Sequence, residues 1–250
     1  MLNEFQDQVA VVTGASRGIG RATALELAQL GARVLVNYQQ NATAAQNVVD
    51  EIIQLGGEAL AYAADVSDAA AVREMIKATL SRWGRLDILI NNAGITADAP
   101  LMRLRPDQWQ KVIDVDLTSV FLCCQAALPT MQQQRYGRII NVGSLAGLAG
   151  NVGQANYAAA KAGLVGFSRA LAREVACDGV TVNIVAPGYI ETELLDSAAP
   201  AVRAWALEAI ALRRFGAPEE VAAAIAFLAS SRSSYITGHV LVIDGGWVMP

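Results

Sequence analysis

Tyr157 and Lys161 stand four residues apart in the stretch NYAAAK, residues 156–161, with only alanines between them. On a helix, side chains four positions apart lie on the same face, and alanine favours the helix while leaving room beside the pair. Two interpretations are open at this point. The pair is either a phenol and an amine on a solvated helix face, or an acid–base pair in a cleft, and the surrounding sequence must decide.

A hydroxyl group is expected close to this pair, because Ser144 follows the apolar run GRIINV (137–142) shortly before the helix begins. Reduction of a ketone needs a hydride at carbon, which a nicotinamide cofactor brings, and a proton at oxygen. Tyr157 can donate that proton, and a nearby ammonium such as Lys161 lowers the pKa of a phenol from its usual value of about 10. Lys161 can also bind the nicotinamide ribose, and Ser144 can hydrogen-bond the developing alkoxide. Together the three residues predict chemistry on a carbonyl group.

Apolar segments of strand length alternate with segments of helical periodicity, which implies βαβ units and a parallel sheet. Such a sheet binds ligands beyond the carboxyl ends of its strands. We therefore predict an α/β protein, a single-domain Rossmann-type doubly wound fold with a seven-stranded parallel sheet over residues 1–250. The expected strands are 9–13, 33–38, 59–66, 86–92, 137–142, 180–187 and 239–244, and the expected helices are 19–30, 42–55, 69–82, 107–133, 157–177 and 218–230.

The glycine-rich stretch TGASRGIG (13–20) follows the first expected strand and enters a helix. Glycines let the backbone approach a phosphate closely, and the helix N-terminus adds N–H groups and a positive dipole end. The spacing is G-x3-G-x-G rather than the usual G-x-G-x-x-G. An NAD-binding fold usually has an acid after its second strand, where Asn37 and Tyr38 stand here, and the guanidinium of Arg17 suits a 2′-phosphate. We expect NADP(H); the alternative is that Arg17 is an ordinary surface arginine.

Other strand ends add further cofactor candidates. Asp65 could accept a hydrogen bond from an adenine amino group, and Asn91–Gly94 forms a turn beside the expected cofactor, although the same residues also make a good ordinary turn. The candidate cofactor-binding residues are Gly14, Ser16, Arg17, Gly18, Ile19, Gly20, Asn37, Tyr38, Asp65, Val66, Asn92, Ala93, Gly94, Tyr157, Lys161, Pro187, Gly188, Ile190 and Thr192.

Composition narrows the functional classes. The chain has 250 residues, is 54% hydrophobic and carries a formal charge of −4, without a basic block for nucleic acid. The single histidine leaves no multi-histidine metal site, and we predict no metal. The N-terminus shows no secretory signal, and no run of about 18 uncharged apolar residues predicts a membrane span. The three cysteines form no CxxC motif, so we expect buried thiols in a reducing compartment, the cytoplasm.

These motifs resemble those of the short-chain dehydrogenase/reductase family in its compact single-domain form. The matching stretches are TGASRGIG (13–20), NNAG (91–94), NVGS (141–144), YAAAK (157–161) and PGYIET (187–192), so the resemblance covers essentially the whole chain. It implies that Tyr157 is the catalytic acid/base, Lys161 its partner and Ser144 the oxyanion donor. It also implies that Pro187–Gly188, Ile190 and Thr192 flank the nicotinamide carboxamide.

Within this family the chain is most similar to the 3-oxoacyl-[acyl-carrier-protein] reductases, through residues 91–98, 100–104, 150–176 and 235–246. The similarity implies NADPH-dependent reduction of a 3-oxoacyl thioester, linked to acyl carrier protein or coenzyme A, in fatty acid synthesis. It also implies a homotetramer that uses the helices 107–133 and 157–177 and the C-terminal strand. The alternatives are a reductase or dehydrogenase of a free ketone or secondary alcohol (sugar, steroid or aryl ketone) and a non-catalytic dinucleotide sensor.

One departure from the family concerns Asp116. The family pattern is like DVNLTSVF, and this chain has DVDLTSVF, with Asp116 in place of an asparagine that is thought to hold a water linked to the lysine. A carboxylate accepts a hydrogen bond but does not donate one unless protonated, and it would raise the pKa of a neighbouring lysine. We count Asp116 with Ser144, Tyr157 and Lys161 as a candidate catalytic residue and expect an altered pH optimum. The alternative is that backbone groups hold the water.

A second departure concerns the carrier protein, which is acidic. Arg135, with Arg138 as a second candidate, matches the first docking region of the family, but Asp178 stands where a second basic residue is typical. A like charge weakens the encounter with an acidic partner, unless Arg169 and Arg173 compensate.

After PGYIET, residues 193–215 are rich in alanine and leucine and predict a substrate lid, with a helix packed on the core as the alternative.

Overall fold

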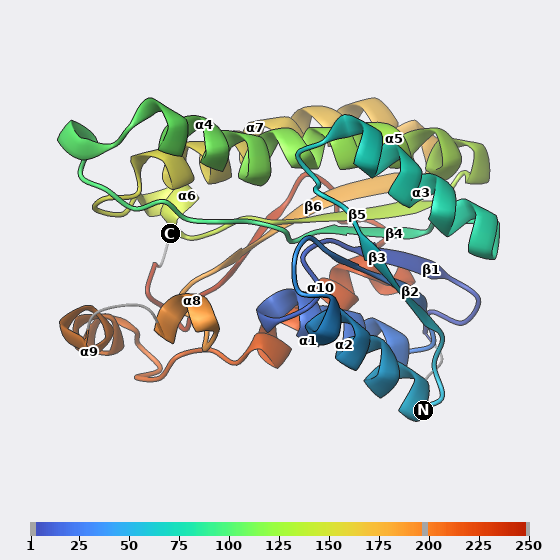
Figure 1. Ribbon diagram of the computed structural model, residues 1–250, viewed down its shortest axis with the longest axis horizontal. Helices are drawn as coiled ribbons and strands as arrows, with labels where there is room; N and C mark the ends of the chain where they lie inside the picture. The colour runs from blue at the N-terminus through green and yellow to red at the C-terminus, as the bar shows by residue number, and fades with distance from the viewer. Residues whose placement is uncertain (1–3, 197–199, 249–250) are drawn as a thin grey trace.

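Seven parallel strands form one sheet in the computed structural model of the chain, which describes residues 4–196 and 200–248 (Figure 1). The strand order is β3-β2-β1-β4-β5-β6-β7, so the direction of winding reverses between β1 and β4. This confirms the predicted doubly wound sheet, and the reversal marks the edge at which such sheets bind ligands. The strands are Val9–Val12 (β1), Arg33–Tyr38 (β2), Ala59–Ala63 (β3), Ile88–Asn91 (β4), Gly137–Val142 (β5), Val180–Pro187 (β6) and Val240–Ile243 (β7).

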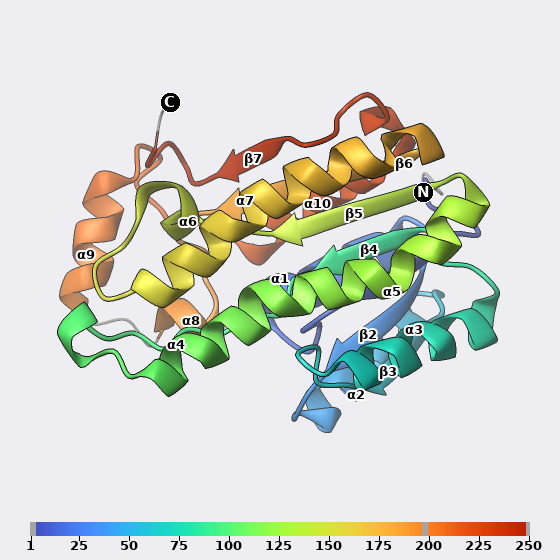
Figure 2. The same cartoon turned by 90° about the horizontal axis from the view of Figure 1, so that it is seen from above.

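Helices cover both faces of the sheet, as the two views in Figures 1 and 2 show. Successive strand residues point to opposite faces, so Ile88 and Ile90 enter one core and Leu89 enters the other. Burial on both faces explains why the strands are continuous apolar runs. One layer contains α1 (Gly18–Gln29), α2 (Ala42–Gln54) and α10 (Pro218–Ala229), and the other contains α3 (Ala69–Trp83), α5 (Ser119–Gln134) and α7 (Ala155–Val175).

The helix predicted over 107–133 is interrupted in the structure. Helix α4 (Pro106–Ile113) leads into a π-helical turn, η2 (Asp114–Thr118), before α5 continues the same rod. The rod Pro106–Gln134 is long and apolar enough to cross a membrane by length and composition alone. It contacts α3, α7, β4 and β5 instead, so it is a layer of the fold and not a membrane span.

Cys123 and Cys124 are buried, whereas Cys177 is exposed, so the expectation of buried thiols is wrong for Cys177.

The remaining helical elements are short. The short elements are η1 (Leu101–Arg103), α6 (Ala146–Ala149), η3 (Ala176–Asp178), α8 (Glu193–Asp196), α9 (Pro200–Ala209) and η4 (Ser231–Ser233).

Candidate active site

The glycine turn after β1 lies against the turn after β4. Gly14 has a φ of +60°, which favours glycine, and a Cβ there would lie 2.9 Å from Cα of Ala93. The amide of Asn92 joins the two turns by donating to the carbonyl oxygens of Thr13 at 2.9 Å and Gly14 at 3.1 Å. The side chain of Asn92 therefore holds the glycine turn against the turn after β4.

Thr13 is a site residue that sequence reasoning missed. Its hydroxyl accepts from the backbone N–H groups of Asn92 at 2.9 Å and Ala93 at 3.0 Å, and it donates to the Ile90 carbonyl at 3.3 Å. One side chain thus connects the ends of β1 and β4, the two strands between which the direction of winding reverses. A threonine at the end of an apolar strand gives no sign of this role, because its three partners are 77 to 80 positions away in the sequence.

The candidate residues Asn37, Tyr38 and Asp65 lie at the ends of β2 and β3. Asn37 is only 2% exposed, and its side chain accepts from the Gly14 N–H at 3.2 Å and donates to the Ala64 carbonyl at 3.1 Å. The side chain of Asn37 therefore supports the glycine turn. Tyr38 is half-buried, and the carboxylate of Asp65 accepts hydrogen bonds from Ser67 and from Gln39.

The segment 187–193 closes the other side of the glycine turn. A Cβ on Gly18 would meet Cγ2 of Thr192 at 3.4 Å, and Arg17 of the turn forms an ion pair with Glu193 at the start of α8. Ile190 is buried and forms an isolated parallel β-bridge with Gly216, which anchors the segment to the chain just before α10. The cofactor candidates Ser16 and Ile19 are half-buried in the same turn, and Val66 is buried after β3.

The predicted chemical residues gather at the carboxyl end of β5. Lys161 is 4% exposed, and its ammonium donates to the carbonyl of Val142, the last residue of β5, at 2.9 Å. The same Nζ lies 5.6 Å from the ring centroid of Tyr157, which is half-buried. Ser144 follows β5 by two residues, and its Oγ accepts from the Ala146 N–H at 3.2 Å. A lysine fixed beneath a tyrosine, with a serine on the adjoining strand end, is an arrangement suited to proton transfer at an oxygen.

Two residues that sequence reasoning missed keep α7 in position. Asn156 is fully buried, and its amide donates to the Ala97 carbonyl at 3.1 Å and the Gln108 carbonyl at 3.4 Å. Gly147 of α6 packs directly on α7, because a Cβ there would lie 2.7 Å from the carbonyl carbon of Lys161. The start of the helix that carries Tyr157 is thereby connected to Ala97, α4 and α6.

Asp116 lies in the π-helical turn and is fully buried beside Lys161. Its Oδ1 accepts from the Ile95 N–H at 2.8 Å, whereas its Oδ2 is buried with no hydrogen-bond partner in the structure. A Cβ on Gly94 would lie 2.6 Å from Oδ1 of Asp116 and 3.4 Å from Nζ of Lys161, so both groups border the same space. Burial raises the pKa of Asp116 to about 6, and the positive charge of Lys161 opposes part of that rise.

Trp205 and Phe215 of the predicted lid belong to a small aromatic cluster with Tyr189 and Trp247, which lie outside the lid. Tyr189 lies 6.3 Å from Phe215 and 6.0 Å from Trp247 between ring centroids, and Trp205 of α9 meets Trp247 edge-on at 6.0 Å. Residues 197–199 of the predicted lid, 193–215, lie outside the described residues. In the described part, α8 and α9 pack on this cluster near the C-terminal segment (Figure 1).

The proposed docking residues lie at the other edge of the sheet. Arg135 ends α5 just before β5 begins, and it forms an ion pair with Asp178 at 2.7 Å. Arg138 is 5% exposed, and its guanidinium donates to the carbonyls of Gly137 and Gly179. Arg138 is therefore part of the structure of the strand and not a surface docking residue.

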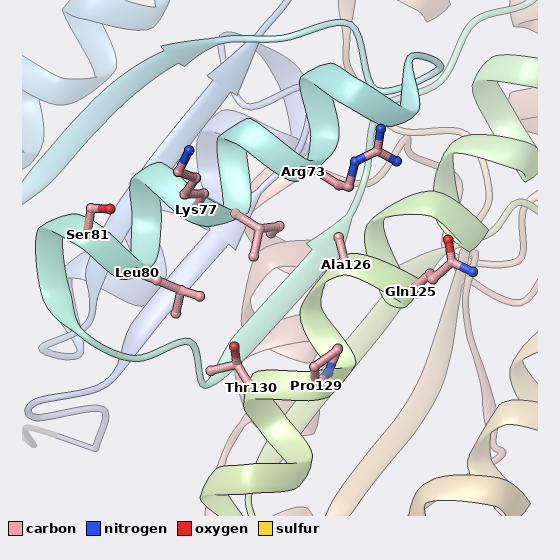
Figure 3. Close-up of a pocket in the computed structure, with 9 residues that line it drawn as sticks. Arg73, Lys77, Leu80, Ser81, Gln125, Ala126, Pro129 and Thr130 are labelled. Atoms are coloured by element: carbon pink, nitrogen blue, oxygen red, sulfur yellow. The ribbon is translucent and has the colours of Figure 1, made fainter.

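An open groove of about 620 Å³ lies between α3 and α5 (Figure 3). Arg73 and Lys77 line it from α3, and Gln125 and Pro129 line it from α5. None of the candidate catalytic or cofactor residues contributes to it. The groove is thus separate from the chemical site at the strand ends.

Comparison with known proteins agrees with this geometry. Residues 14–248 match the family model described as "Enoyl-(Acyl carrier protein) reductase". The 3-oxoacyl-[acyl-carrier-protein] reductase of Synechocystis sp. is 54% identical over 245 residues, which is 97% of this chain and 97% of the relative. The 3-oxoacyl-[acyl-carrier-protein] reductase FabG of Staphylococcus aureus is 48% identical over 240 residues, 96% of this chain and 98% of the relative. The fold, the strand-end motifs and these matches together show that the chain belongs to the short-chain dehydrogenase/reductase family.

Proposed function

We propose that this protein reduces a 3-oxoacyl thioester, linked to acyl carrier protein or coenzyme A, to the 3-hydroxyacyl thioester with NADPH. The observation that carries the proposal is the placement of Tyr157 over Lys161, with Lys161 fixed to the end of β5 next to Ser144. The similarity to the 3-oxoacyl-[acyl-carrier-protein] reductases of Synechocystis and Staphylococcus supports the same substrate class.

The residues at the strand ends fit a dinucleotide. Gly14 and Gly18 have positive φ values and carry no side chain at the N-terminus of α1, where N–H groups and the positive end of the helix dipole favour phosphate oxygens. When bound there, the nicotinamide cofactor supplies a hydride to the carbonyl carbon. Arg17 is the only cation in segments 14–20 and 36–41, and Asn37 and Tyr38 place no acid there, which favours a 2′-phosphate and hence NADP(H).

The side chains of the protein supply the proton that the reduction requires. Tyr157 donates its phenolic proton to the substrate oxygen, while Ser144 hydrogen-bonds that oxygen as negative charge develops on it. The ammonium of Lys161 stabilises the resulting phenolate, and a proton from solvent restores the phenol. The ketone thus gains one hydride and one proton and becomes an alcohol, and the thioester bond remains intact.

Asp116 acts as a positioning residue in this scheme. Its Oδ2 is buried without a hydrogen-bond partner in the described structure, and the positive charge of Lys161 favours the ionised form of the carboxyl group against the effect of burial. Its buried carboxylate distinguishes this chain from the asparagine-containing family pattern.

The assembly and location remain part of the proposal. Trp109 on α4 and Phe121 on α5 are 39% and 44% exposed, and large apolar side chains of this kind suit a subunit interface. We expect a cytoplasmic homotetramer that buries this rod, with residues 193–215 as the substrate lid. Light scattering on the purified protein measures the mass of the assembly directly.

One substrate panel tests the function. Acetoacetyl-carrier protein, acetoacetyl-coenzyme A, a neutral 3-ketoester and an aryl ketone are each assayed with NADPH and NADH, and a crotonyl thioester is added to detect C=C reduction. We expect the acetoacetyl thioesters with NADPH to give the highest kcat/KM. Preference for the free aryl ketone would favour the alternative, a reductase of free ketones or secondary alcohols, and crotonyl turnover alone would exclude carbonyl reduction.

A further inference from the structure

A single ion pair joins the glycine turn to α8. The guanidinium of Arg17, at the N-cap of α1, contacts the carboxylate of Glu193, the first residue of α8, across 176 positions of sequence. Both side chains are mostly exposed, at 71% and 67%, so each can exchange its partner without unfolding its element. Thr192 already packs against Gly18, which holds the start of α8 beside the turn in the described structure.

The ion pair with Glu193 engages the guanidinium of Arg17, the group that would bind a 2′-phosphate. Arg17 is the only lysine or arginine in segments 14–20 and 36–41, which face the phosphates and the adenosine ribose in the proposed function. While Glu193 is its partner, the guanidinium is directed at α8 and its charge is compensated. The other acid of this segment, Glu191, exerts its charge on Arg214 instead.

We propose that Glu193 is a specificity-determining residue that competes with the 2′-phosphate of the cofactor for Arg17. The inference rests on the proposed NADP(H) dependence. A 2′-phosphate forms a charge-assisted contact with Arg17 and displaces the carboxylate of Glu193, whereas a cofactor with a free 2′-hydroxyl leaves the ion pair intact. Because Glu193 begins α8, the same exchange removes the ion pair between α8 and the turn and leaves the start of α8 held there by the contact of Thr192 with Gly18. The two cofactors therefore differ in their effect on α8 as well as in affinity.

The expected effect is modest because exposed ion pairs are weak. Replacing Glu193 removes one surface ion pair that competes with the cofactor. We therefore expect the dissociation constant of NADP⁺ to decrease about two- to fivefold. The dissociation constant of NAD⁺ should not change, since the free 2′-hydroxyl of NAD⁺ does not compete with Glu193 for Arg17.

Calorimetric titration of the full chain with NADP⁺ and NAD⁺ tests this without turnover. We compare wild type, Glu193→Gln and the matched control Glu191→Gln, which removes the same charge two residues earlier. We expect Glu193→Gln alone to bind NADP⁺ about two- to fivefold more tightly, and we expect the gain to vanish when Arg17→Gln is added. Equal affinity of Glu193→Gln and wild type for NADP⁺, or an equal gain for NAD⁺, would overturn the proposal.

The same titrations separate this proposal from the cofactor assignment. If wild type binds NAD⁺ as tightly as NADP⁺, the NADP(H) preference itself fails; if wild type prefers NADP⁺ and only the effect of Glu193→Gln is missing, the competition alone fails. A second measurement uses the unmodified protein. Adenosine 2′,5′-bisphosphate should raise amide hydrogen exchange in α8 relative to AMP, and equal exchange with both ligands would contradict the loss of the ion pair between α8 and the turn.

Discussion

Lys161 is constrained on two sides of its ammonium. The Val142 carbonyl accepts one of its protons at 2.9 Å, and the ring of Tyr157 lies on the other side at 5.6 Å from centroid to Nζ. A long lysine side chain loses much rotamer freedom in such a site, so the position is preorganised for a partner that must be stabilised there. That partner in the proposed reaction is the phenolate of Tyr157.

Replacing Tyr157 by phenylalanine removes the proton donor and keeps the ring. General acid catalysis contributes about 10²–10⁴-fold to rate, so we expect kcat for acetoacetyl-coenzyme A to fall by that factor. Binding of NADP⁺ should change little, because the ring and Lys161 remain. Initial rates and a cofactor titration on the same preparation measure both quantities. A variant that retains more than a tenth of wild-type kcat would show that another group delivers the proton.

Asp116→Asn tests whether the buried carboxylate shapes the pH profile. Lys161 is the charged group whose field acts on Asp116, and the Ile95 N–H is its hydrogen-bond donor. With a pKa of about 6, Asp116 is ionised above that pH and protonated below it. We expect kcat/KM of the wild type to decrease as the pH is lowered through about 6, and we expect the asparagine variant to lack this decrease. Superimposable pH–rate profiles of the two proteins would refute a role for Asp116 in the proton relay.

Stability gives an independent readout of the same residue. The pKa of Asp116 rises from 3.8 to about 6 on folding, so the native state binds the extra proton between these values. The free energy of unfolding therefore decreases as the pH rises from about 4 to 6, by on the order of 2–3 kcal/mol, and stays lower above pH 6. Urea titrations at pH 4 and pH 7.5 should show Asp116→Asn gaining stability over wild type at the higher pH only.

At the scale of elements, the sheet and its helices could be predicted because burial on both faces forces a distinctive apolar pattern on each strand. The π-helical turn over Asp114–Thr118 could not, since its apolar periodicity still suits one continuous helix. The hydrogen bonds of the Asn37 side chain with the Ala64 carbonyl and the Gly14 N–H could not be predicted either, because these groups are 27 and 23 positions away in the sequence. The Arg17–Glu193 pair joins residues too distant in sequence for any local pattern to indicate it.

The contact between α6 and α7 places the catalytic helix, and two glycines test it. Gly147→Ala puts a methyl group 2.7 Å from the carbonyl carbon of Lys161, so we expect α6 to be displaced and stability to fall by about 1–3 kcal/mol. Gly166→Ala is the matched control on α7, because a Cβ there meets nothing within 4 Å and alanine favours the helix by about 0.5–1 kcal/mol. Thermal unfolding compares them, and equal effects of the two substitutions would show that α6 does not press on α7.

At the scale of the whole molecule, the position of Arg135 and Asp178 bears on how a carrier protein could approach. Both lie where β5 and β6 begin, whereas Ser144, Tyr157 and Lys161 lie where β5 ends. The rod Pro106–Gln134 has 29 residues, or roughly 43 Å of helix. If two rods pair antiparallel in the proposed tetramer, the Arg135 end of one subunit lies beside the Pro106 end of its partner. A docking contact at Arg135 would then serve the active site of the partner.

Asp178→Asn tests this arrangement, because it removes the charge that compensates Arg135 and keeps an oxygen that can accept from Gln132. The freed guanidinium should attract an acidic carrier, so we expect kcat/KM for acetoacetyl-carrier protein to rise about two- to fivefold at low salt and to converge with wild type at high salt. The neutral 3-ketoester should show no change. Asp107→Asn is the matched control: it frees Arg105 at the start of α4, near the strand ends that carry the chemistry. A gain in Asp107→Asn with none in Asp178→Asn would place the carrier at the mouth of the same subunit and contradict docking at Arg135.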